Sequence, residues 1–348
     1  MRVLWVTNMW PDAIRPWYGS FVFSQARSLI ELGVDLDVLY IPGYSRRSEY
    51  IRAIGRLHRL LARQRFDVIH AHYGHAAVVA RTQWFAPLVI SYCGSDLLGR
   101  PSNDAAATAS RSSVALAYLF AQLARAAAAT ITKSAAMAER LPRTVRRRNH
   151  VIPNGVDLQR FVPGDRHAAR AQVGWDNGEL HALFIGHPDN PAKNFPLAQA
   201  VVDEIRRRGH RVALHAAVGV RPDLVPTLMN AADVLLFTSL SEGSPNVIKE
   251  AMATELPIVS VPVGDVPDRL RGVDGAFVVG SEPSAMADAF LRAAAIGRAP
   301  QARTAVQALS LERVARRVLS VYETVVSSPA PAGRKPTDAL VSSSRRHM

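Results

Sequence analysis

The chain has 348 residues, 48% of them hydrophobic and 20% charged, and a formal net charge of +13 at pH 7. This length predicts two domains, and the composition excludes a disordered or fibrous protein. A single cysteine, Cys93, excludes an intrachain disulfide and a structural metal site built from thiolates, which suits a reducing cytoplasm.

The apolar run at the amino terminus ends at Asn8 and is too short for a signal peptide. No later run reaches the ~18 apolar residues of a membrane-spanning helix. We therefore expect a cytoplasmic protein. The excess of arginine favours partners that carry phosphates or present an anionic surface.

The first half of the chain alternates short apolar runs with segments of helical length. Helices are predicted over residues 19–32, 51–66 and 114–128. Runs typical of buried parallel strands lie at residues 3–7, 36–40, 68–72, 88–92, 129–132 and 151–153. This alternation predicts a doubly wound α/β domain.

The alternation starts again after a polar stretch at residues 159–179, which we interpret as the interdomain connection. The second set of predicted strands lies at residues 181–185, 211–215, 234–238, 257–261 and 276–279. We expect a first domain over residues 1–160 and a second over 161–310. A last helix at 311–326 precedes a tail, 327–348, whose composition predicts disorder.

The strongest local signal is the segment from Ser241 to Ala253, which follows the predicted strand 234–238. Gly243 permits close approach of the backbone, Ser244 can cap a helix and Pro245 suits the first helical position. Backbone N–H groups at the start of that helix would face a cleft and suit a phosphate.

Two carboxylates, Glu242 and Glu250, stand at different depths along this segment, an arrangement that suits a polyhydroxylated ligand. Such a pair by itself is usually a capped helix with two solvated glutamates. The preceding strand, the glycine turn and the Glu-Ala-Met-Ala context at residues 250–253 favour the binding interpretation.

This segment resembles the donor-site signature of the retaining glycosyltransferases of family 4. Further segments resemble the same family in the same order, at residues 152–157, 184–186, 193–194, 264–267 and 311–322. The resemblance covers residues ~1–326 and implies a GT-B fold, in which two Rossmann-like doubly wound parallel-sheet domains face a central cleft. The helix at 311–326 would return to the first domain.

The resemblance also implies roles for individual residues. Glu250 would hold the ribose hydroxyls of a nucleotide diphosphate sugar, and Glu242 would contact the transferred sugar. The backbone N–H groups of Gly243, Ser244 and Asn246 would line the sugar and diphosphate, and Pro245 would take part through its position in the same loop. Lys193 would neutralise the diphosphate as it leaves, because a preorganised cation stabilises that growing charge.

No metal and no cofactor is expected, since the nucleotide sugar is itself the substrate. No Asp-x-Asp element stands in a suitable loop, because Asp35 and Asp37 fall at a predicted strand start. His187 stands where the family usually has arginine, and Cys93 where many members have histidine. A histidine at position 187 could serve the donor diphosphate as a cation or as a neutral donor.

In the first domain, Gly19 follows the first strand at a turn that would face the donor phosphates. On the acceptor side, His72 ends the third predicted strand. It could face the acceptor in the cleft, or it could have only a structural role. Asp96 could approach the acceptor or cap a turn.

Residues 51–66 form a cationic amphipathic helix, which can lie on an anionic membrane or pack its apolar face on its own sheet. Nucleic acid is not an expected partner, because exposed aromatic residues do not interleave with the arginines. We expect transfer to a glycan or lipid-linked acceptor in polysaccharide or glycolipid assembly. The alternatives are a GT-B nucleotide-sugar epimerase and a non-catalytic nucleotide-sugar-binding protein.

Overall fold

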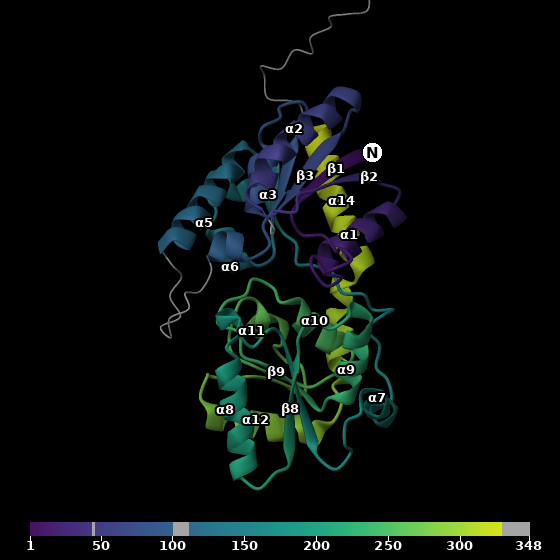
Figure 1. The fold of residues 1–348 in the computed structure, drawn as a ribbon, viewed down its shortest axis with the longest axis vertical. Helices are drawn as coiled ribbons and strands as arrows, with labels where there is room; N and C mark the ends of the chain where they lie inside the picture. The colour runs from purple at the N-terminus through teal and green to yellow at the C-terminus, as the bar shows by residue number, and fades with distance from the viewer. Residues whose placement is uncertain (44–45, 100–110, 329–348) are drawn as a thin grey trace, which may run out of the picture.

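A computed structural model describes residues 1–43, 46–99 and 111–328. The chain forms two α/β lobes, one above the other in Figure 1, and each lobe is built around a parallel sheet. The first sheet has the strand order β2-β1-β3-β4-β5-β6 and the second has the order β11-β10-β9-β7-β8. Both orders place the first strand of the lobe inside the sheet, as in doubly wound folds.

The strands are short, and most are buried, as their apolar composition predicts. Those of the first lobe are β1 (Arg2–Thr7), β2 (Asp35–Tyr40), β3 (Val68–His72), β4 (Leu88–Ser91), β5 (Ala129–Thr132) and β6 (Asn149–Val151). Those of the second lobe are β7 (Leu180–Ile185), β8 (Val212–Ala217), β9 (Val234–Phe237), β10 (Ile258–Ser260) and β11 (Ala276–Val278).

Helices connect the strands and cover both faces of each sheet. In the first lobe they are α1 (Ser20–Glu31), α2 (Ser48–Arg63), α3 (Gly74–Ala80), α4 (Ser95–Leu98), α5 (Arg111–Leu123) and α6 (Ala135–Glu139). The later helices are α7 (Arg166–Val173), α8 (Phe195–Arg207), α9 (Val225–Ala231), α10 (Asn246–Ala253), α11 (Val266–Arg269), α12 (Pro283–Ile296), α13 (Pro300–Val306) and α14 (Leu311–Ser327).

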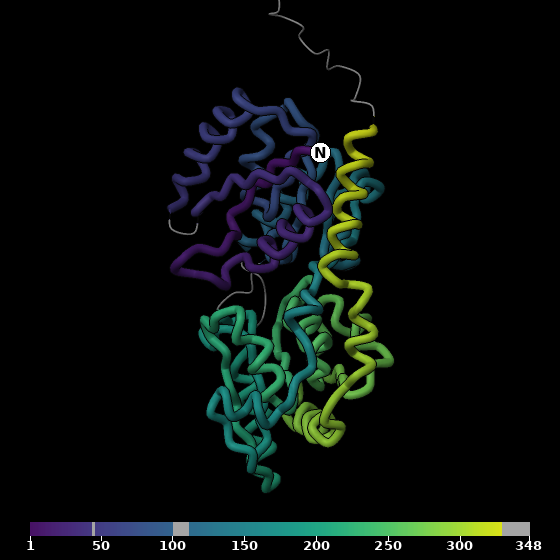
Figure 2. The backbone as a smooth tube through the Cα atoms, turned by 90° about the vertical axis from the view of Figure 1, so that its right-hand side faces the viewer, coloured from purple at the N-terminus to yellow at the C-terminus, as the bar shows by residue number. Residues whose placement is uncertain are grey.

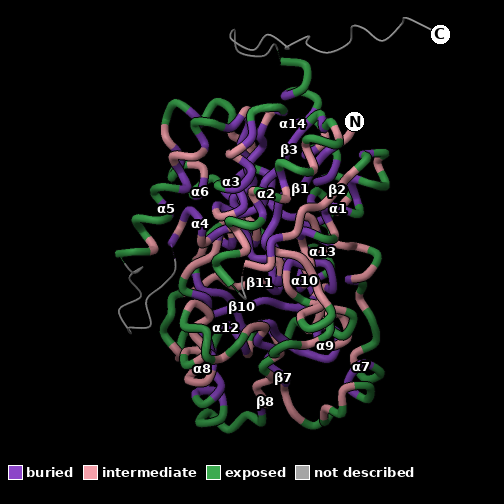
Figure 3. Tube along the Cα trace, turned by 45° about the horizontal axis from the view of Figure 1, so that its top comes forward, coloured by how far each residue is buried: buried purple, intermediate pink, exposed green. Residues whose placement is uncertain are grey.

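Alternation along β1 divides the first lobe into two cores. Val3 and Trp5 pack on the face that α1 and α14 cover, whereas Leu4 and Val6 pack on the face that α2, α3 and α5 cover. Successive side chains of a strand point to opposite faces, so one apolar run supplies both cores. Figure 3 shows this buried interior, with exposed segments on the outer helices.

The last helix, α14, runs back to the first lobe, as Figure 2 shows in yellow. Its Tyr322 hydroxyl accepts a hydrogen bond from Trp5 Nε1 at 3.0 Å and lies 2.5 Å from His70 Nδ1. Val314, Val318 and Val321 share one core cluster with residues of both lobes. The helical spacing of these valines therefore serves to join the lobes.

Two sequence expectations need correction. The polar stretch at 159–179 is not only a connection, because it contains α7, where Ala169 and Arg170 are buried and Arg170 bonds Asp233 at 2.7 Å. The sixth strand runs over Asn149–Val151, so only its last residue falls in the predicted 151–153. Most of the tail predicted to be disordered, residues 329–348, lies outside the described residues.

Helix α2 begins at Ser48 and ends at Arg63, and it buries Ala53 and Leu57 against the rest of its lobe. The apolar face of this amphipathic helix therefore packs on its own domain. None of the described helices is both long enough and apolar enough to cross a membrane.

Candidate functional site

A cavity of about 520 Å³ lies between the two lobes. Its walls come from the loop after β4 in the first lobe and from the loops after β7 and β9 in the second. The lining residues are Cys93, Gly94, Ser95, Leu98, Gly99, Asn190, Pro191, Ala192, Lys193, Ser241, Glu242 and Gly243. Carboxyl ends of parallel strands are where α/β domains bind ligands, so this cavity is the candidate site.

Lys193 and Glu242 meet in the wall of this cavity. Lys193 Nζ lies 2.5 Å from Glu242 Oε1, and both side chains are mostly buried, with 25% and 20% of their surface exposed. The sequence places them 49 positions apart, and only the fold pairs them. The pair therefore places a cation and a carboxylate in direct contact in the wall of the cavity.

The loop that carries Lys193 is fixed by the residues following β9. The Thr238 hydroxyl donates to the carbonyl oxygens of Lys193 and Asn194 at 2.9 and 3.0 Å. The backbone N–H of Leu240 donates to Ala192 at 2.8 Å, and Asn190 Oδ1 accepts from Ala192 N at 3.1 Å. Thr238 is buried, so the position of Lys193 depends on an interior hydrogen bond that the sequence analysis missed.

The turn at Gly264 supports the loop of Glu242 and Gly243. Gly264 has φ +59°, and a Cβ atom there would lie 2.7 Å from the carbonyl oxygens of Glu242 and Gly243. The backbone N–H of Asp265 donates to Gly243 O at 3.2 Å. Glycine is therefore required here both by the backbone conformation and by the close approach.

Ser244 does not cap the following helix, which corrects the sequence expectation. Helix α10 begins at Asn246 with Pro245 in the capping position and has no side-chain cap, so proline precedes the first helical residue. Ser244 Oγ instead donates to Asp265 Oδ2 at 2.8 Å. This bond ties the glycine turn to the 264–265 turn, which is why the hydroxyl is unavailable to the helix.

A buried lysine lies beneath the same loop. Lys249 has no exposed surface, and its Nζ lies 3.3 and 3.4 Å from the hydroxyl and carbonyl oxygens of Ser244. Burial lowers the pKa of Lys249 to about 7, although Asp265 acts in the opposite direction. Sequence reasoning could have noted it as a charged residue on the buried face of α10.

Glu250 stands one turn into α10, on its partly exposed side. Burial raises the pKa of this carboxyl to about 7, against the lowering influence of Arg160 and Lys249. Arg160 comes from the segment that joins the lobes and was not among the predicted site residues. Asn246, at the start of α10, accepts a hydrogen bond from Asn154 Nδ2 at 3.2 Å and so links the helix to that segment.

Gly243 lies at the contact between the lobes. A Cβ atom on it would come within 2.5 Å of Met137 Sδ and 3.9 Å of Gly94 Cα, both in the first lobe. Figure 1 shows α10 and α11 at the end of the second lobe that faces the first. The glycine therefore lets the loop that carries Glu242 and Gly243, called the donor loop below, approach the first lobe closely.

Gly19 has φ +72° and precedes α1. A Cβ atom there would lie 2.4 Å from the carbonyl carbon of Met9, so the glycine holds the loop after β1 against the start of the helix.

His187 does not line the cavity. Its ring is exposed, with Nδ1 3.2 Å from the backbone N of Asp189, and its predicted diphosphate contact stays a prediction.

On the acceptor side, His72 and Asp96 are both buried. Asp96 accepts hydrogen bonds from the backbone N–H groups of Gly74, Cys93 and Gly94 at 2.8–3.2 Å. Asp96 therefore orders the turn that lines the cavity. Of the two roles expected from the sequence, these hydrogen bonds correspond to capping a turn. A direct contact of either residue with an acceptor stays a prediction.

Cys93 is a thiol in this setting. Burial raises its pKa to about 12, and its Sγ lies 3.7 Å from the carbonyl oxygen of Ser91. It lines the cavity beside Gly94, at the position where many members of the resembled family have histidine. No three His, Cys, Asp or Glu side chains within the described residues gather as metal ligands would.

Comparison with known families agrees with this geometry. The family model described as Glycosyltransferase Family 4 matches residues 2–160, the first lobe. The model described as Glycosyl transferases group 1 matches residues 167–295, which include Lys193, Glu242 and Glu250. The chain belongs to the family 4 glycosyltransferases.

Curated relatives of this glycosyltransferase carry several names. D-inositol 3-phosphate glycosyltransferases of Geodermatophilus obscurus and of Mycobacterium sp. (strain KMS) are 28% and 30% identical to it. The alignments cover 78% and 70% of this chain, but only 69% and 62% of those relatives. The putative teichuronic acid biosynthesis glycosyltransferase TuaC of Bacillus subtilis is 24% identical, with 84% and 89% covered.

Solved structures share the architecture of this glycosyltransferase. The sucrose-phosphate synthase of Thermosynechococcus elongatus superposes with a TM-score of 0.76 at 18% identity, covering 93% of this chain and 98% of that one. HepE of Anabaena, solved with UDP and glucose, gives 0.68 at 19% identity, covering 93% and 100%. The fold is GT-B, as expected, and the family assignment favours a transferase over the epimerase and non-catalytic alternatives.

Proposed function

We propose that this enzyme transfers a sugar, with retention of anomeric configuration, from a nucleotide diphosphate sugar to a glycan or lipid-linked acceptor. The observation that carries the proposal is the Lys193–Glu242 pair in a cavity walled by both lobes. HepE, a structural neighbour, was solved with UDP-glucose, and TuaC is named for teichuronic acid biosynthesis. These names support a nucleotide-sugar donor and a role in polysaccharide assembly.

In this proposal the donor lies along the second lobe. Glu250 accepts hydrogen bonds from the two ribose hydroxyls. A carboxylate has two oxygens that can each accept one of these neighbouring O–H groups, and hydrogen bonds to an ionised group are strong. The free backbone N–H groups where α10 begins, at Asn246 and Val247, face the diphosphate or sugar. Glu242 accepts a hydrogen bond from the transferred sugar.

Lys193 acts on the leaving group. As the bond between the anomeric carbon and the diphosphate oxygen breaks, negative charge grows on the β-phosphate, and an ammonium held beside it lowers the barrier. Thr238 positions this ammonium through the loop backbone. The acceptor oxygen attacks from the face that the diphosphate leaves, and a diphosphate oxygen takes the acceptor proton. The proposal requires no metal and no protein nucleophile.

The test is thermal unfolding with UDP, GDP and ADP in turn. A ligand at ~100 times its Kd stabilises the folded state by ~2.7 kcal/mol. One nucleotide should raise the Tm of the wild type and of a Glu312→Gln control, whose glutamate is exposed on α14, and should raise that of Glu250→Gln markedly less at the same concentration. If no nucleotide raises the Tm, or if the response of Glu250→Gln equals that of the wild type, the donor-site assignment is wrong.

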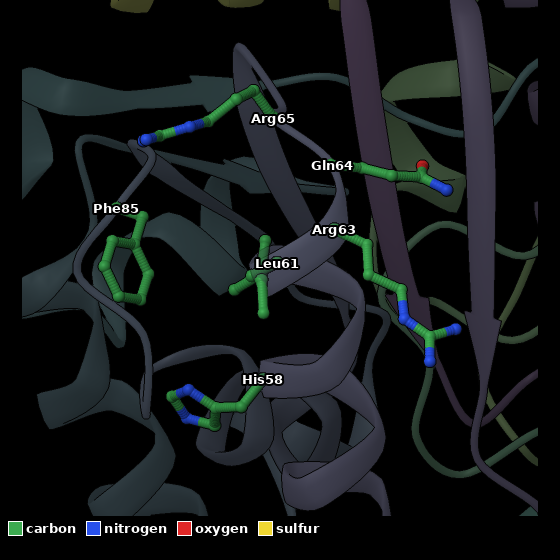
Figure 4. A pocket seen from close by; sticks show the side chains of 7 residues that line it. His58, Leu61, Arg63, Gln64, Arg65 and Phe85 are labelled. Carbon is green, nitrogen blue, oxygen red and sulfur yellow. The ribbon is translucent and has the colours of Figure 1, made fainter. Parts of the chain in front are cut away.

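We also propose that the first lobe contacts anionic membrane through the loop of Trp84 and Phe85. These rings are 58% and 70% exposed, and buried Gln83 holds their loop by bonds to the backbone of residues 85 and 86. Beside Phe85 lies a hollow of about 330 Å³ at the end of α2, bordered by His58, Arg63 and Arg65 (Figure 4). Exposed aromatic rings beside arginines suit a lipid interface.

Co-sedimentation with lipid vesicles tests this surface. Vesicles with ~30% anionic lipid should retain the wild type, and neutral vesicles should not. A Trp84→Ser, Phe85→Ser double variant should lose retention, whereas Tyr118→Ser, which removes an equally exposed ring on α5, should keep it. Equal retention of all three proteins would refute the proposed surface.

A further inference from the structure

Three adjacent strands of the first sheet end beside one another next to the cavity. His72 is the last residue of β3 and pairs in register with Ser91, the last residue of β4. Ser91 in turn pairs with Ile131 of β5, and Lys133 follows the end of that strand. The carboxyl edge of this sheet therefore brings His72, Cys93 and Lys133 together.

Lys133 is a buried cation, with 2% of its surface exposed. Among the described residues it makes no hydrogen bond and no ion pair with a carboxylate. Burial lowers the pKa of Lys133, and Cys93 and Asp96 act in the opposite direction, but Cys93 is a thiol. Both Asp96 oxygens already accept backbone N–H bonds, so Asp96 offsets the charge of Lys133 without satisfying its three N–H donors.

His72 adds a second unsatisfied group. Its Nε2 is buried and has no hydrogen-bond partner within the described part of the chain. Burial lowers its pKa well below the usual range, so the ring is neutral and carries one N–H. Trp5 and His70 both pack against this ring, each with its ring centroid 4.1 Å from that of His72 and 5.5 Å from the other, so the ring cannot easily turn to another partner.

This edge faces the donor loop of the second lobe. Helix α6 begins two residues after Lys133, and its Met137 lies against Gly243. Lys249, beneath that loop, is near enough for Lys133 to lower its pKa. Two buried ammonium groups from opposite lobes thus approach the place where, under the proposed function, donor sugar and acceptor meet.

We propose that Lys133, with His72 beside it, binds an oxyanion, a carboxylate or a phosphate, carried by one of the two sugar substrates. Burying an ammonium without a hydrogen-bonded partner destabilises a fold, and a bound anion removes that cost. Charge-assisted bonds to the anion also discriminate strongly against a neutral analogue, because the neutral analogue leaves the buried donors unpaired. This inference rests on the proposed function and narrows its substrates to anionic sugars or anionic acceptors.

The experiment compares Lys133→Met with the wild type in two binding arms. The donor arm measures the Kd of UDP-glucuronate against UDP-glucose by calorimetry. The acceptor arm adds inorganic phosphate to protein already saturated with UDP, so that the diphosphate site is filled, and follows the Tm. Lys249→Met serves as a control, because that lysine bonds Ser244 of the donor loop and its loss should weaken all ligands alike.

In the wild type we expect one arm to respond, with UDP-glucuronate bound ~10-fold more tightly than UDP-glucose, or with an added rise in Tm from phosphate. Lys133→Met should lose that response, keep its Kd for UDP within ~3-fold, and unfold at the same or a higher temperature. The donor arm would assign the anion to the transferred sugar, and the acceptor arm to the acceptor.

The inference is overturned if neither arm responds in the wild type, if Lys133→Met keeps the response, or if that variant loses stability markedly. The last result would mean that the lysine supports the fold. Failure of UDP, GDP and ADP alike to bind the wild type would instead refute the proposed function. The two failures are therefore distinguishable.

Discussion

Lys193 and Glu242 form an ion pair whose Nζ and Oε1 atoms are 2.5 Å apart, within the wall of the interlobe cavity. A lysine that neutralises a leaving diphosphate must share its charge between that group and Glu242. The carboxylate therefore both orients the ammonium and competes with phosphate for it.

Replacing Glu242 with glutamine should separate these two effects. Glu242→Gln removes the competing charge, so the affinity for UDP should rise by about 5-fold, the size expected of a partly exposed ion pair. Turnover, followed as UDP release from the donor, should fall because the sugar loses its contact and the ammonium its orientation. Weaker UDP binding in this variant would show that Glu242 aids diphosphate binding.

Gly264 should be required for the donor loop and not merely for its own turn. Gly264→Ala strains a left-handed backbone, by about 1–2 kcal/mol, and also drives a methyl group into the carbonyl oxygens of Glu242 and Gly243. Gly272→Ala is the matched control, since Gly272 has φ +72° with no atom within 4 Å of the added carbon. Calorimetry should find weakened nucleotide binding only in Gly264→Ala, and an equal effect of both would contradict the proposed support.

Thr238 should influence catalysis without touching a substrate. Thr238→Val leaves the carbonyl groups of Lys193 and Asn194 without their buried donor, at a cost of about 1–3 kcal/mol, and lets the lysine loop shift. We expect kcat to fall more than the KM for the donor rises. Thr238→Ser keeps the hydroxyl and should restore kcat. Similar kcat values for the valine and serine variants would exclude this positioning role.

Glu250 predicts a pH dependence of nucleotide binding. Its pKa of about 7 lies above the ordinary 4.5, so between these values the folded protein holds a proton that the unfolded chain releases. Stability contributed by this group therefore falls as pH rises through that window. Ribose hydroxyls favour the ionised carboxylate, so nucleotide affinity should rise between about pH 6 and about pH 8.

Calorimetric titrations across this range, on the wild type and on Glu250→Gln, isolate the effect. The nucleotide phosphates titrate equally in both proteins, so the difference between the two slopes belongs to Glu250. Parallel slopes would mean that this carboxylate does not ionise on binding.

The amino-acid sequence by itself determined the two lobes and most of their strands. Runs such as 68–72 and 234–238 are apolar and β-branched enough to be buried strands in any setting, and β3 (Val68–His72) and β9 (Val234–Phe237) follow them closely. It also determined which loop carries Glu242 and Gly243, because strand, glycine turn and helix are contiguous in the chain. Local signals of this kind depend on near neighbours.

Only the tertiary structure decided which side chains meet. The pairing of Lys193 with Glu242, the support of that lysine by Thr238 and the burial of Lys133 beside His72 join residues far apart in the chain. Ser244 could equally have capped α10, and its bond to Asp265 was decided by the approach of a distant turn at Gly264. Hydrogen bonds and buried charges depend on distances between segments, which are set by the packing of the two sheets and not by local pattern.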